Sequence, residues 1–311
     1  MIRKVVEFAT PGTRLSVANR QLVIERPEVA KATLPIEDLG VVIVDNLQTV
    51  YTHAVLTELM AAGATLIVSD EYHLPAGMLL PLDAHTTQTE SHRAQAEASE
   101  PIKKQAWQAL IVAKLAQQAA VLSHFTGADA GLGELAKRVR SGDAENLEAQ
   151  GAQRYWPVLF GKSFRRHREG KPPNDLLNYG YAVLRAATAR AIVAAGLIPT
   201  LGVHHRHRAN PFCLADDLIE PYRPYVDWRA KTLCAESDTP PRIDEKPVRA
   251  ALLSLFNETV VVGGKRSPIL LALHASAASL ARALTGGERT LALPRGLPLS
   301  PEDAAREDDE Q

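Results

Sequence analysis

Hydrophobic residues at the start of the chain come in short β-branched runs separated by turn residues. The runs lie at residues 3–8, 13–18, 21–26, 30–34, 40–44 and 65–68. Leu22 and Ile24 alternate with the residues beside them, which is the period of an antiparallel strand with one buried face. Residues 52–62 instead repeat their apolar positions at helical spacing and stop at Gly63. The pattern predicts a small β-rich domain over residues 1–84 that carries one helix.

The period changes to that of helices after about residue 85. Apolar positions predict helices within residues 101–122, 134–140, 144–160, 176–195, 244–257 and 267–284. The segment 176–195 is nearly continuous in Leu, Val, Ile and Ala, so we expect it to be the central buried helix. Residues 301–311 form an acidic tail that is predicted to be disordered. The fold class that follows is α+β, with the β-rich domain followed by an all-α domain over residues 85–300.

Composition and charge narrow the function classes only a little. The net charge of −1 gives no overall argument for nucleic-acid binding, so any such argument rests on local clusters. Cys213 and Cys234 form no CxxC pair and no disulfide framework, as expected of a reducing compartment. The chain starts without the apolar core of a signal peptide, and its longest apolar stretch, 269–284, is interrupted by His274 and Arg282. We therefore expect a soluble protein of the cytoplasm.

Histidines and carboxylates concentrate in one stretch, at residues 196–224. They are His204, His205, His207, Asp216, Asp217 and Glu220. A histidine loop that leads into a carboxylate-bearing helix can form a divalent-metal site, because imidazole is a common metal ligand. Carboxylate oxygens with one imidazole suit Mg²⁺ or Mn²⁺, and the spacing matches no zinc signature such as HExxH. The residues alone leave open which histidine and which carboxylate would bind.

Glu148 is a further candidate ligand. On a helix over 144–160 it shares a face with Ala152 and Tyr155, and the small residues around it let another segment approach. An exposed helix glutamate would give the same pattern, and residues 216–220 also fit a polar helix face. Pro221 predicts a kink directly after Glu220.

Basic residues cluster near these candidates. The clusters hold Lys162, Arg165, Arg166, Arg168 and Lys171, then Arg206 and Arg208, and also Lys137, Arg138 and Arg140. Such residues neutralise backbone phosphates without reading sequence, and the binding they give is salt-sensitive. A single charge run usually marks a solvated face, but three runs beside candidate ligands favour a nucleic-acid substrate.

Several motifs in combination resemble one known family. Glu148 is followed seven residues later by Tyr155-Trp156, and NYGY at 178–181 lies in the predicted central helix, which exits through GLIP at 196–199. GVHH at 202–205 and CLADDLIEPYRP at 213–224 follow. With these motifs the chain resembles the CRISPR-associated integrase, the endonuclease of spacer acquisition, over nearly its whole length. The histidine-rich turn is similar to the variant found with type II systems.

The resemblance implies a site and its ligands. Glu148, His205 and Glu220 would be the catalytic residues and would hold Mg²⁺ or Mn²⁺. His205 is preferred to His204 because it lies fifteen residues before Glu220, the separation found in the family. The DNA-binding residues would be Lys162, Arg165, Arg166, Arg168, Arg206 and Arg208, which would grip phosphates.

The resemblance also implies partners and a reaction. The β-rich domain would form a homodimer, and a small ferredoxin-like companion protein would complete a larger complex on double-stranded DNA. That complex would join the 3′-hydroxyl ends of a short prespacer to the CRISPR repeat by metal-assisted transesterification, with nuclease activity on branched DNA. The alternatives are a non-catalytic DNA-binding scaffold of the same complex, a phosphodiesterase acting on small nucleotides, and a structural zinc protein.

Overall fold

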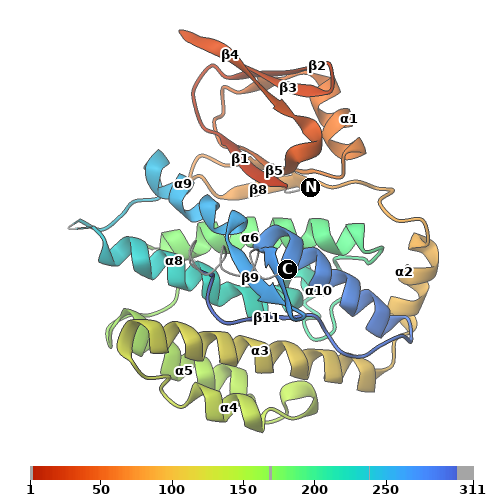
Figure 1. The fold of residues 1–311 in the computed structure, drawn as a ribbon, viewed down its shortest axis with the longest axis vertical. Coiled ribbons are helices and arrows are strands. Elements are labelled where there is room, and N and C mark those ends of the chain that lie inside the picture. The colour runs from red at the N-terminus through yellow and green to blue at the C-terminus, as the bar shows by residue number, and fades with distance from the viewer. Residues whose placement is uncertain (1–2, 168–169, 238, 300–311) are drawn as a thin grey trace, which may run out of the picture.

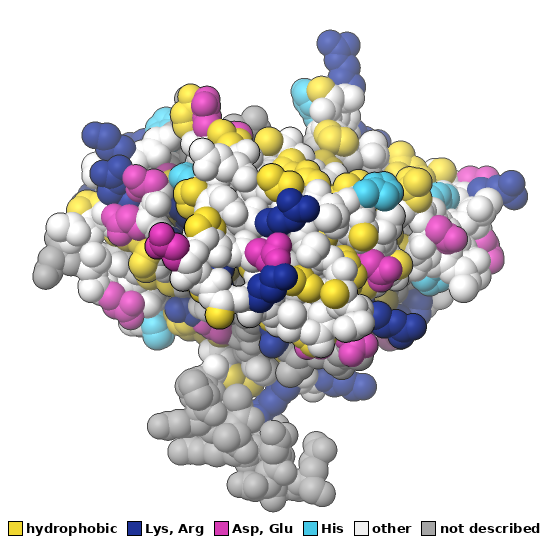
Figure 2. All heavy atoms as spheres, turned by 90° about the horizontal axis from the view of Figure 1, so that it is seen from above, with side chains coloured by type: hydrophobic (Ala, Val, Ile, Leu, Met, Phe, Trp, Pro, Cys, Tyr) yellow, Lys and Arg dark blue, Asp and Glu magenta, His cyan; other side chains and the backbone are white. Residues whose placement is uncertain are grey.

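The computed structural model describes residues 3–167, 170–237 and 239–299. Arg168 and the acidic tail at 301–311 therefore lie outside the described residues. Strands gather at the N-terminal end and helices form the larger body beneath them (Figure 1). The fold class is thus α+β, as predicted. Figure 2 views the molecule from the strand-rich end, where basic and acidic side chains are interspersed.

Two four-stranded sheets make up the N-terminal part. The strands are β1 (Lys4–Phe8), β2 (Arg14–Ala18), β3 (Gln21–Arg26), β4 (Val29–Pro35), β5 (Leu39–Val44), β6 (Val50–Tyr51), β7 (Thr65–Ser69) and β8 (Pro75–Leu79). One sheet has the order β1-β5-β7-β8 and the other β4-β3-β2-β6. Helix α1 (His53–Ala61) packs on β2 and β7. Its residue Leu59 joins a core with Leu15 and Leu22.

The predicted antiparallel pairing is confirmed for part of these strands. β2, β3 and β4 pair antiparallel, and Leu22 and Ile24 are buried as their alternation indicates. β1, β5 and β7 instead pair in parallel, because longer connections carry the chain back between them. All six residues of β5 are buried, which is typical of a parallel strand covered on both faces.

The helical part is built around two long helices. Its helices are α2 (Gln88–Glu97), α3 (Glu100–Thr126), α4 (Leu132–Arg138), α5 (Leu147–Phe160), α6 (Asn174–Ala194), α7 (Cys213–Leu218), α8 (Arg223–Ala235), α9 (Lys246–Ser254) and α10 (Ile269–Leu284). α3 packs against α4, α5 and α8, and α6 packs against α7, α8 and α10. α6 is buried over most of its length, which confirms the predicted central helix. Among the described residues, no helix combines the length and apolar character needed to cross a bilayer.

A small sheet interrupts the helices of this second part, so the prediction that it is all-α was wrong in this detail. β9 (Thr259–Val262), β10 (Lys265–Pro268) and β11 (Pro294–Arg295) form it in the order β10-β9-β11. Gly263 and Gly264 both have positive φ, of 56° and 78°, and close the β9–β10 hairpin in a two-residue turn. A β-branched run before a Gly-Gly pair is the signal that predicts such a hairpin. In this chain the signal at residues 259–264 lies between the helices predicted within 244–257 and 267–284.

Buried charges join the strand-rich part to the helices. Arg249 of α9 lies 2.8 Å from Glu7 of β1 and 3.2 Å from Asp45, which follows β5. The hydroxyl of Tyr179, on α6, donates to the same Glu7 oxygen at 2.9 Å, and His73 Nδ1 lies 2.8 Å from Asp45 Oδ2. This junction network fixes the orientation of the sheets on the helical body.

Candidate functional site

Glu148 and Glu220 converge on one cation. Lys114, in the middle of α3, places its Nζ 2.6 Å from Glu148 Oε1 and 2.5 Å from Glu220 Oε2. Glu148 lies in the first turn of α5, and Glu220 begins the short 3₁₀ helix η3 (Glu220–Tyr222). Two of the three predicted ligands therefore meet, although they come from separate parts of the chain.

The start of α5 fixes Glu148 in place. The carboxylate of Asp143, in the turn η2 (Ser141–Asp143), accepts hydrogen bonds from the backbone N–H of Leu147 at 2.9 Å and of Glu148 at 3.0 Å. A Cβ at Gly151 would lie 2.3 Å from Leu115 Cδ2, so only glycine lets α5 approach α3 this closely. Gly151, one of the small residues near Glu148, thus has the packing role that the sequence predicted.

Glu220 is buried between two cations. Arg223 Nε lies 2.8 Å from its Oε1, and Lys114 lies beside its Oε2. Burial alone would raise the pKa of Glu220, but the charges of Arg223 and Lys114 lower it to about 2. Burial likewise acts to lower the pKa of Lys114, but Glu220 and Glu148 outweigh it and raise that pKa. Glu220 and Lys114 are therefore both ionised near neutral pH.

The predicted break at Pro221 is confirmed. α7 ends at Leu218 and η3 begins at Glu220, before α8 continues from Arg223. Because proline has no N–H to donate, the chain changes its helical form at this position. The break places Glu220 against α3, which packs on η3.

Asp217 organises the histidine loop. This fully buried carboxylate accepts hydrogen bonds from the backbone N–H groups of Val203 at 2.7 Å, His204 at 3.0 Å and His205 at 3.1 Å. Its Oδ1 also lies 2.6 Å from His205 Nδ1. This hydrogen bond raises the pKa of His205, against the opposite effect of burial. A carboxylate on Nδ1 is the arrangement that orients a metal-ligating imidazole and leaves Nε2 for the metal.

Asp216 and Asp217, the alternatives to Glu220, and His204, an alternative to His205, make other contacts. Asp216 forms a bidentate ion pair with Arg185, at 2.6 and 2.7 Å, and accepts from Asn210. His204 stacks on Trp107, with ring centroids 4.0 Å apart. Asp216, Asp217 and His204 therefore serve contacts within the fold, whereas Glu220 meets Glu148 through Lys114. His207 is exposed and accepts a hydrogen bond from the backbone N–H of Ala209 at 3.3 Å.

The three predicted ligands are not drawn together into one coordination shell. The negative charge of Glu220 acts on the pKa of His205, so the two groups are near each other. Within residues 3–167, 170–237 and 239–299, however, no three His, Cys, Asp or Glu side chains have the geometry of a metal site. Lys114 holds the space between the two glutamates.

Gly202 has a packing role in the histidine loop that leads to a stability prediction. A Cβ at this position would lie 2.4 Å from the backbone oxygen of His205 and 2.8 Å from Asp217 Oδ2. Gly202→Ala is therefore expected to lower the free energy of unfolding by about 1–3 kcal/mol, the usual cost of overpacking. Urea denaturation checks this, with Gly77→Ala as the comparison, since neither glycine has a positive φ and a Cβ at Gly77 would meet only Val68 Cγ2, at 3.4 Å. Equal losses in the two variants would contradict the crowding at Gly202.

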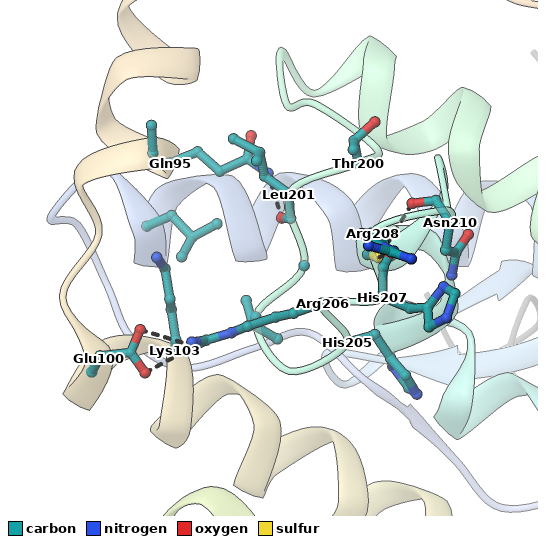
Figure 3. A pocket seen from close by; sticks show the side chains of 15 residues that line it. Gln95, Glu100, Lys103, Thr200, Leu201, His205, Arg206, His207, Arg208 and Asn210 are labelled. Carbon is teal, nitrogen blue, oxygen red and sulfur yellow. Dashed lines mark hydrogen bonds and ion pairs between the residues drawn. The ribbon is translucent and has the colours of Figure 1, made fainter.

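A cavity of about 430 Å³ opens beside the histidine loop. Its lining includes Lys103, His205, Arg206, His207 and Arg208 (Figure 3). Arg206 extends across it to Glu100, with both carboxylate oxygens 2.8 Å from its Nη2. The predicted DNA contacts Arg206 and Arg208 thus line the same hollow as His205.

A second cavity, of about 380 Å³, opens beside Lys114 and Glu220. Its lining includes Lys114, Gln118, Arg166, Tyr181, Glu220, Arg223 and Asp227. Arg166 reaches it from the basic loop and is held by Asn178 Oδ1 at 2.7 Å and Asn174 Oδ1 at 3.1 Å. Arg166 and Arg223 both lie over the ring of Tyr181. The structure thus brings Arg166 to the cavity that Glu220 lines, whereas Lys162 and Arg165 are exposed.

Asp227 gives this cavity a pH-dependent group. Burial raises its pKa to about 7, although hydrogen bonds from Tyr181 and Tyr155 act to lower it. The folded protein therefore keeps a proton that the unfolded chain loses near pH 4. The stability that this proton contributes is full below about pH 4 and is lost as the pH rises through about 7.

We expect the unfolding free energy of the native protein to fall relative to that of Asp227→Asn as the pH rises from 4 to 7. The asparagine variant keeps the shape of the carboxylic acid but cannot ionise. Denaturation of both proteins at several pH values measures the difference. A constant difference across this range would show that Asp227 does not titrate there.

Sequence reasoning missed four residues that position the predicted ligands: Lys114, Asp143, Trp107 and Arg223. Lys114 and Trp107 lie on the apolar pattern of α3, where they look like ordinary helix and core residues. Asp143, directly after Ser141-Gly142, had a usable signal, since Asp is favoured before a helix start. Arg223 belongs to the motif CLADDLIEPYRP at 213–224, but the sequence alone assigned it no function.

Comparison with known proteins places this geometry in a family. The family model described as CRISPR associated protein Cas1 matches residues 7–253. A CRISPR-associated endonuclease Cas1 from Neisseria meningitidis serogroup C (strain 8013) is 44% identical over 219 residues, 70% of this chain and 71% of that protein. One from Pyrobaculum aerophilum is 26% identical over 297 residues, 90% of this chain and 98% of that protein.

Solved structures share the fold. A casposase bound to its integration product has a TM-score of 0.76 at 20% identity, covering 93% of this chain and 92% of that one. A Cas1 protein from Thermotoga maritima has a TM-score of 0.75 at 16% identity, covering 96% and 99%. With a family model that spans most of its length and a relative at 44% identity, the chain belongs to the Cas1 family of CRISPR associated proteins.

Proposed function

We propose that this chain is a metal-dependent DNA endonuclease and integrase that inserts short DNA segments into a CRISPR array. The observation that carries the proposal is the convergence of Glu148 and Glu220 on one cation, beside an imidazole whose Nδ1 is held by Asp217. Relatives named as Cas1 endonucleases and a casposase bound to an integration product support the same assignment.

The donor set suits Mg²⁺ or Mn²⁺. Two carboxylates and one neutral imidazole are ligands that these ions accept, and Asp217 supplies the hydrogen bond that orients a ligating histidine. Glu148, His205 through Nε2, and Glu220 would hold the ion. When bound, the ion would act as a Lewis acid on the phosphodiester and stabilise the charge that develops during transfer.

The residues around the ligands would orient the DNA. Arg166 lines the second cavity together with Glu220, and Arg206 and Arg208 line the first together with His205. We assign them to backbone phosphates, together with the exposed Lys162 and Arg165. Arg168 belongs to the same predicted set but lies outside the described residues. Such contacts position DNA without reading its bases.

The remaining assignments concern assembly. We propose that residues 1–84 form a dimerisation domain and residues 85–300 the catalytic domain. A ferredoxin-like companion would complete the complex on a DNA duplex. Solved Cas6-RT-Cas1–Cas2 complexes and a Cas1–DNA complex of similar fold support a companion protein and a DNA partner. The alternative is a DNA-binding scaffold of that complex without its own catalysis.

A strand-transfer assay tests the proposal. The purified chain with its companion would receive a labelled duplex with 3′-hydroxyl ends and a supercoiled plasmid that carries a repeat, in Mn²⁺ or in EDTA. We expect joined product in Mn²⁺ and none in EDTA, together with metal-dependent cleavage of branched DNA. Tight, salt-sensitive DNA binding without either reaction would overturn the catalytic assignment and leave the scaffold.

A further inference from the structure

Lys114 occupies the position between the two glutamates that a metal ion would also need. Its side chain is 10% exposed, and its ammonium is within 2.6 Å of both carboxylates. Glu220 has a second cation in Arg223, whereas the ion pair of Glu148 is with Lys114. Without Lys114, the charge of Glu148 would face that of Glu220 across a half-buried gap, and like charges at this distance repel.

A divalent cation and this ammonium cannot share the gap. Each oxygen that the ammonium contacts is one that a metal would bind, and the two cations would repel each other at such short range in a partly buried site. Lys114 must therefore leave the gap when a metal enters, and its four-carbon stem is flexible enough to let the ammonium move.

The structure holds a place for the displaced ammonium. Lys114 and Gln118 are one helical turn apart on α3, so their side chains lie on the same face, and both line the cavity of about 380 Å³. Gln118 is 2% exposed, and its Oε1 is buried without a hydrogen-bond partner among the described residues. A buried amide oxygen without a donor is costly, so it is an acceptor ready for a donor such as an ammonium.

We propose that Lys114 is an internal counter-ion of this site, which neutralises Glu148 and Glu220 until a divalent cation binds and then turns into the neighbouring cavity toward Gln118. The inference rests on the proposed function, because it takes these glutamates as metal ligands. Lys114 is then a positioning residue that holds the carboxylates together in the metal-free protein. It also sets the metal affinity below the value that the carboxylates alone would give.

Titration calorimetry with Mn²⁺ on the full chain tests the proposal. Lys114→Met keeps the length of the side chain without its charge, and we expect it to bind Mn²⁺ about tenfold more tightly or better, which corresponds to about 1.4 kcal/mol. Its melting temperature without metal should fall, and Mn²⁺ should raise it by more than in the native protein. Gln118→Leu, which keeps Lys114 but removes the acceptor, should bind Mn²⁺ several-fold more weakly.

The matched control is Lys31→Met, which removes an exposed lysine 2.5 Å from Glu25 in the strand-rich part. It should leave Mn²⁺ affinity unchanged. An unchanged or weaker affinity in Lys114→Met would overturn the counter-ion role, provided that binding is lost in Glu148→Gln. Binding that survives Glu148→Gln would instead overturn the metal centre itself, so the two failures are distinguishable.

Discussion

Glu220→Gln is expected to reduce metal-dependent strand transfer by more than about a hundredfold, because the loss of a ligand's hydrogen-bond partner alone already costs about 10- to 100-fold at metal sites. The amide keeps the shape of the side chain but carries no charge for a cation. DNA affinity should stay unchanged, since phosphates are bound by the arginines rather than by Glu220. Parallel assays of strand transfer and of DNA binding measure the two effects.

Glu288→Gln is a suitable control, because this glutamate is exposed and lies in the loop after α10. It should behave as the native protein in both assays. If Glu220→Gln joined DNA at the native rate, Glu220 would not be a ligand. If it lost DNA binding as well, its effect would be structural.

Arg249→Met is expected to lower the free energy of unfolding by about 3–5 kcal/mol, the usual cost of breaking a buried ion pair by removing one partner. Arg249 is 3% exposed and its partners Glu7 and Asp45 are 7% and 1% exposed in their side chains. Its removal leaves two buried carboxylates close together at the junction of the sheets and the helices. Urea denaturation followed by circular dichroism gives the difference.

The matched control for Arg249 is Arg242→Met. Arg242 pairs with Asp244 at 2.7 Å, but both side chains are about half exposed or more, at 67% and 49%. An exposed pair of this kind contributes roughly 0–1 kcal/mol. A similar small loss in Arg249→Met would mean that the junction network does not hold the two parts together.

Local pattern predicted the elements of the fold better than their pairing. The alternation in β3 and the apolar run of α6 each reflect which face is buried, so they are visible in the sequence. The parallel pairing of β1 with β5 is different, because it depends on where the intervening strands place the chain. The β9–β10 hairpin was missed because four-residue strands carry too little pattern between two helices.

The residues of the functional site also differ in how well the sequence predicts them. Glu148, His205 and Glu220 could be proposed from the sequence, because they lie in motifs that resemble those of a known family. Lys114 could not, because its contact with Glu148 spans 34 residues and nothing in the pattern of α3 marks it. The hydrogen bond that Asp217 accepts from His205 spans only 12 residues, but its role depends on a fully buried carboxylate, which the sequence presents as part of a polar helix face.

We propose that Glu148, His205 and Glu220 together hold one divalent cation. Anomalous diffraction from crystals of the full chain soaked in Mn²⁺ would locate that ion. We expect one Mn²⁺ peak within bonding distance of a carboxylate oxygen of each glutamate and of His205 Nε2, with the Lys114 ammonium displaced from between them. A peak on other residues, or no peak between these three at saturating Mn²⁺, would contradict it.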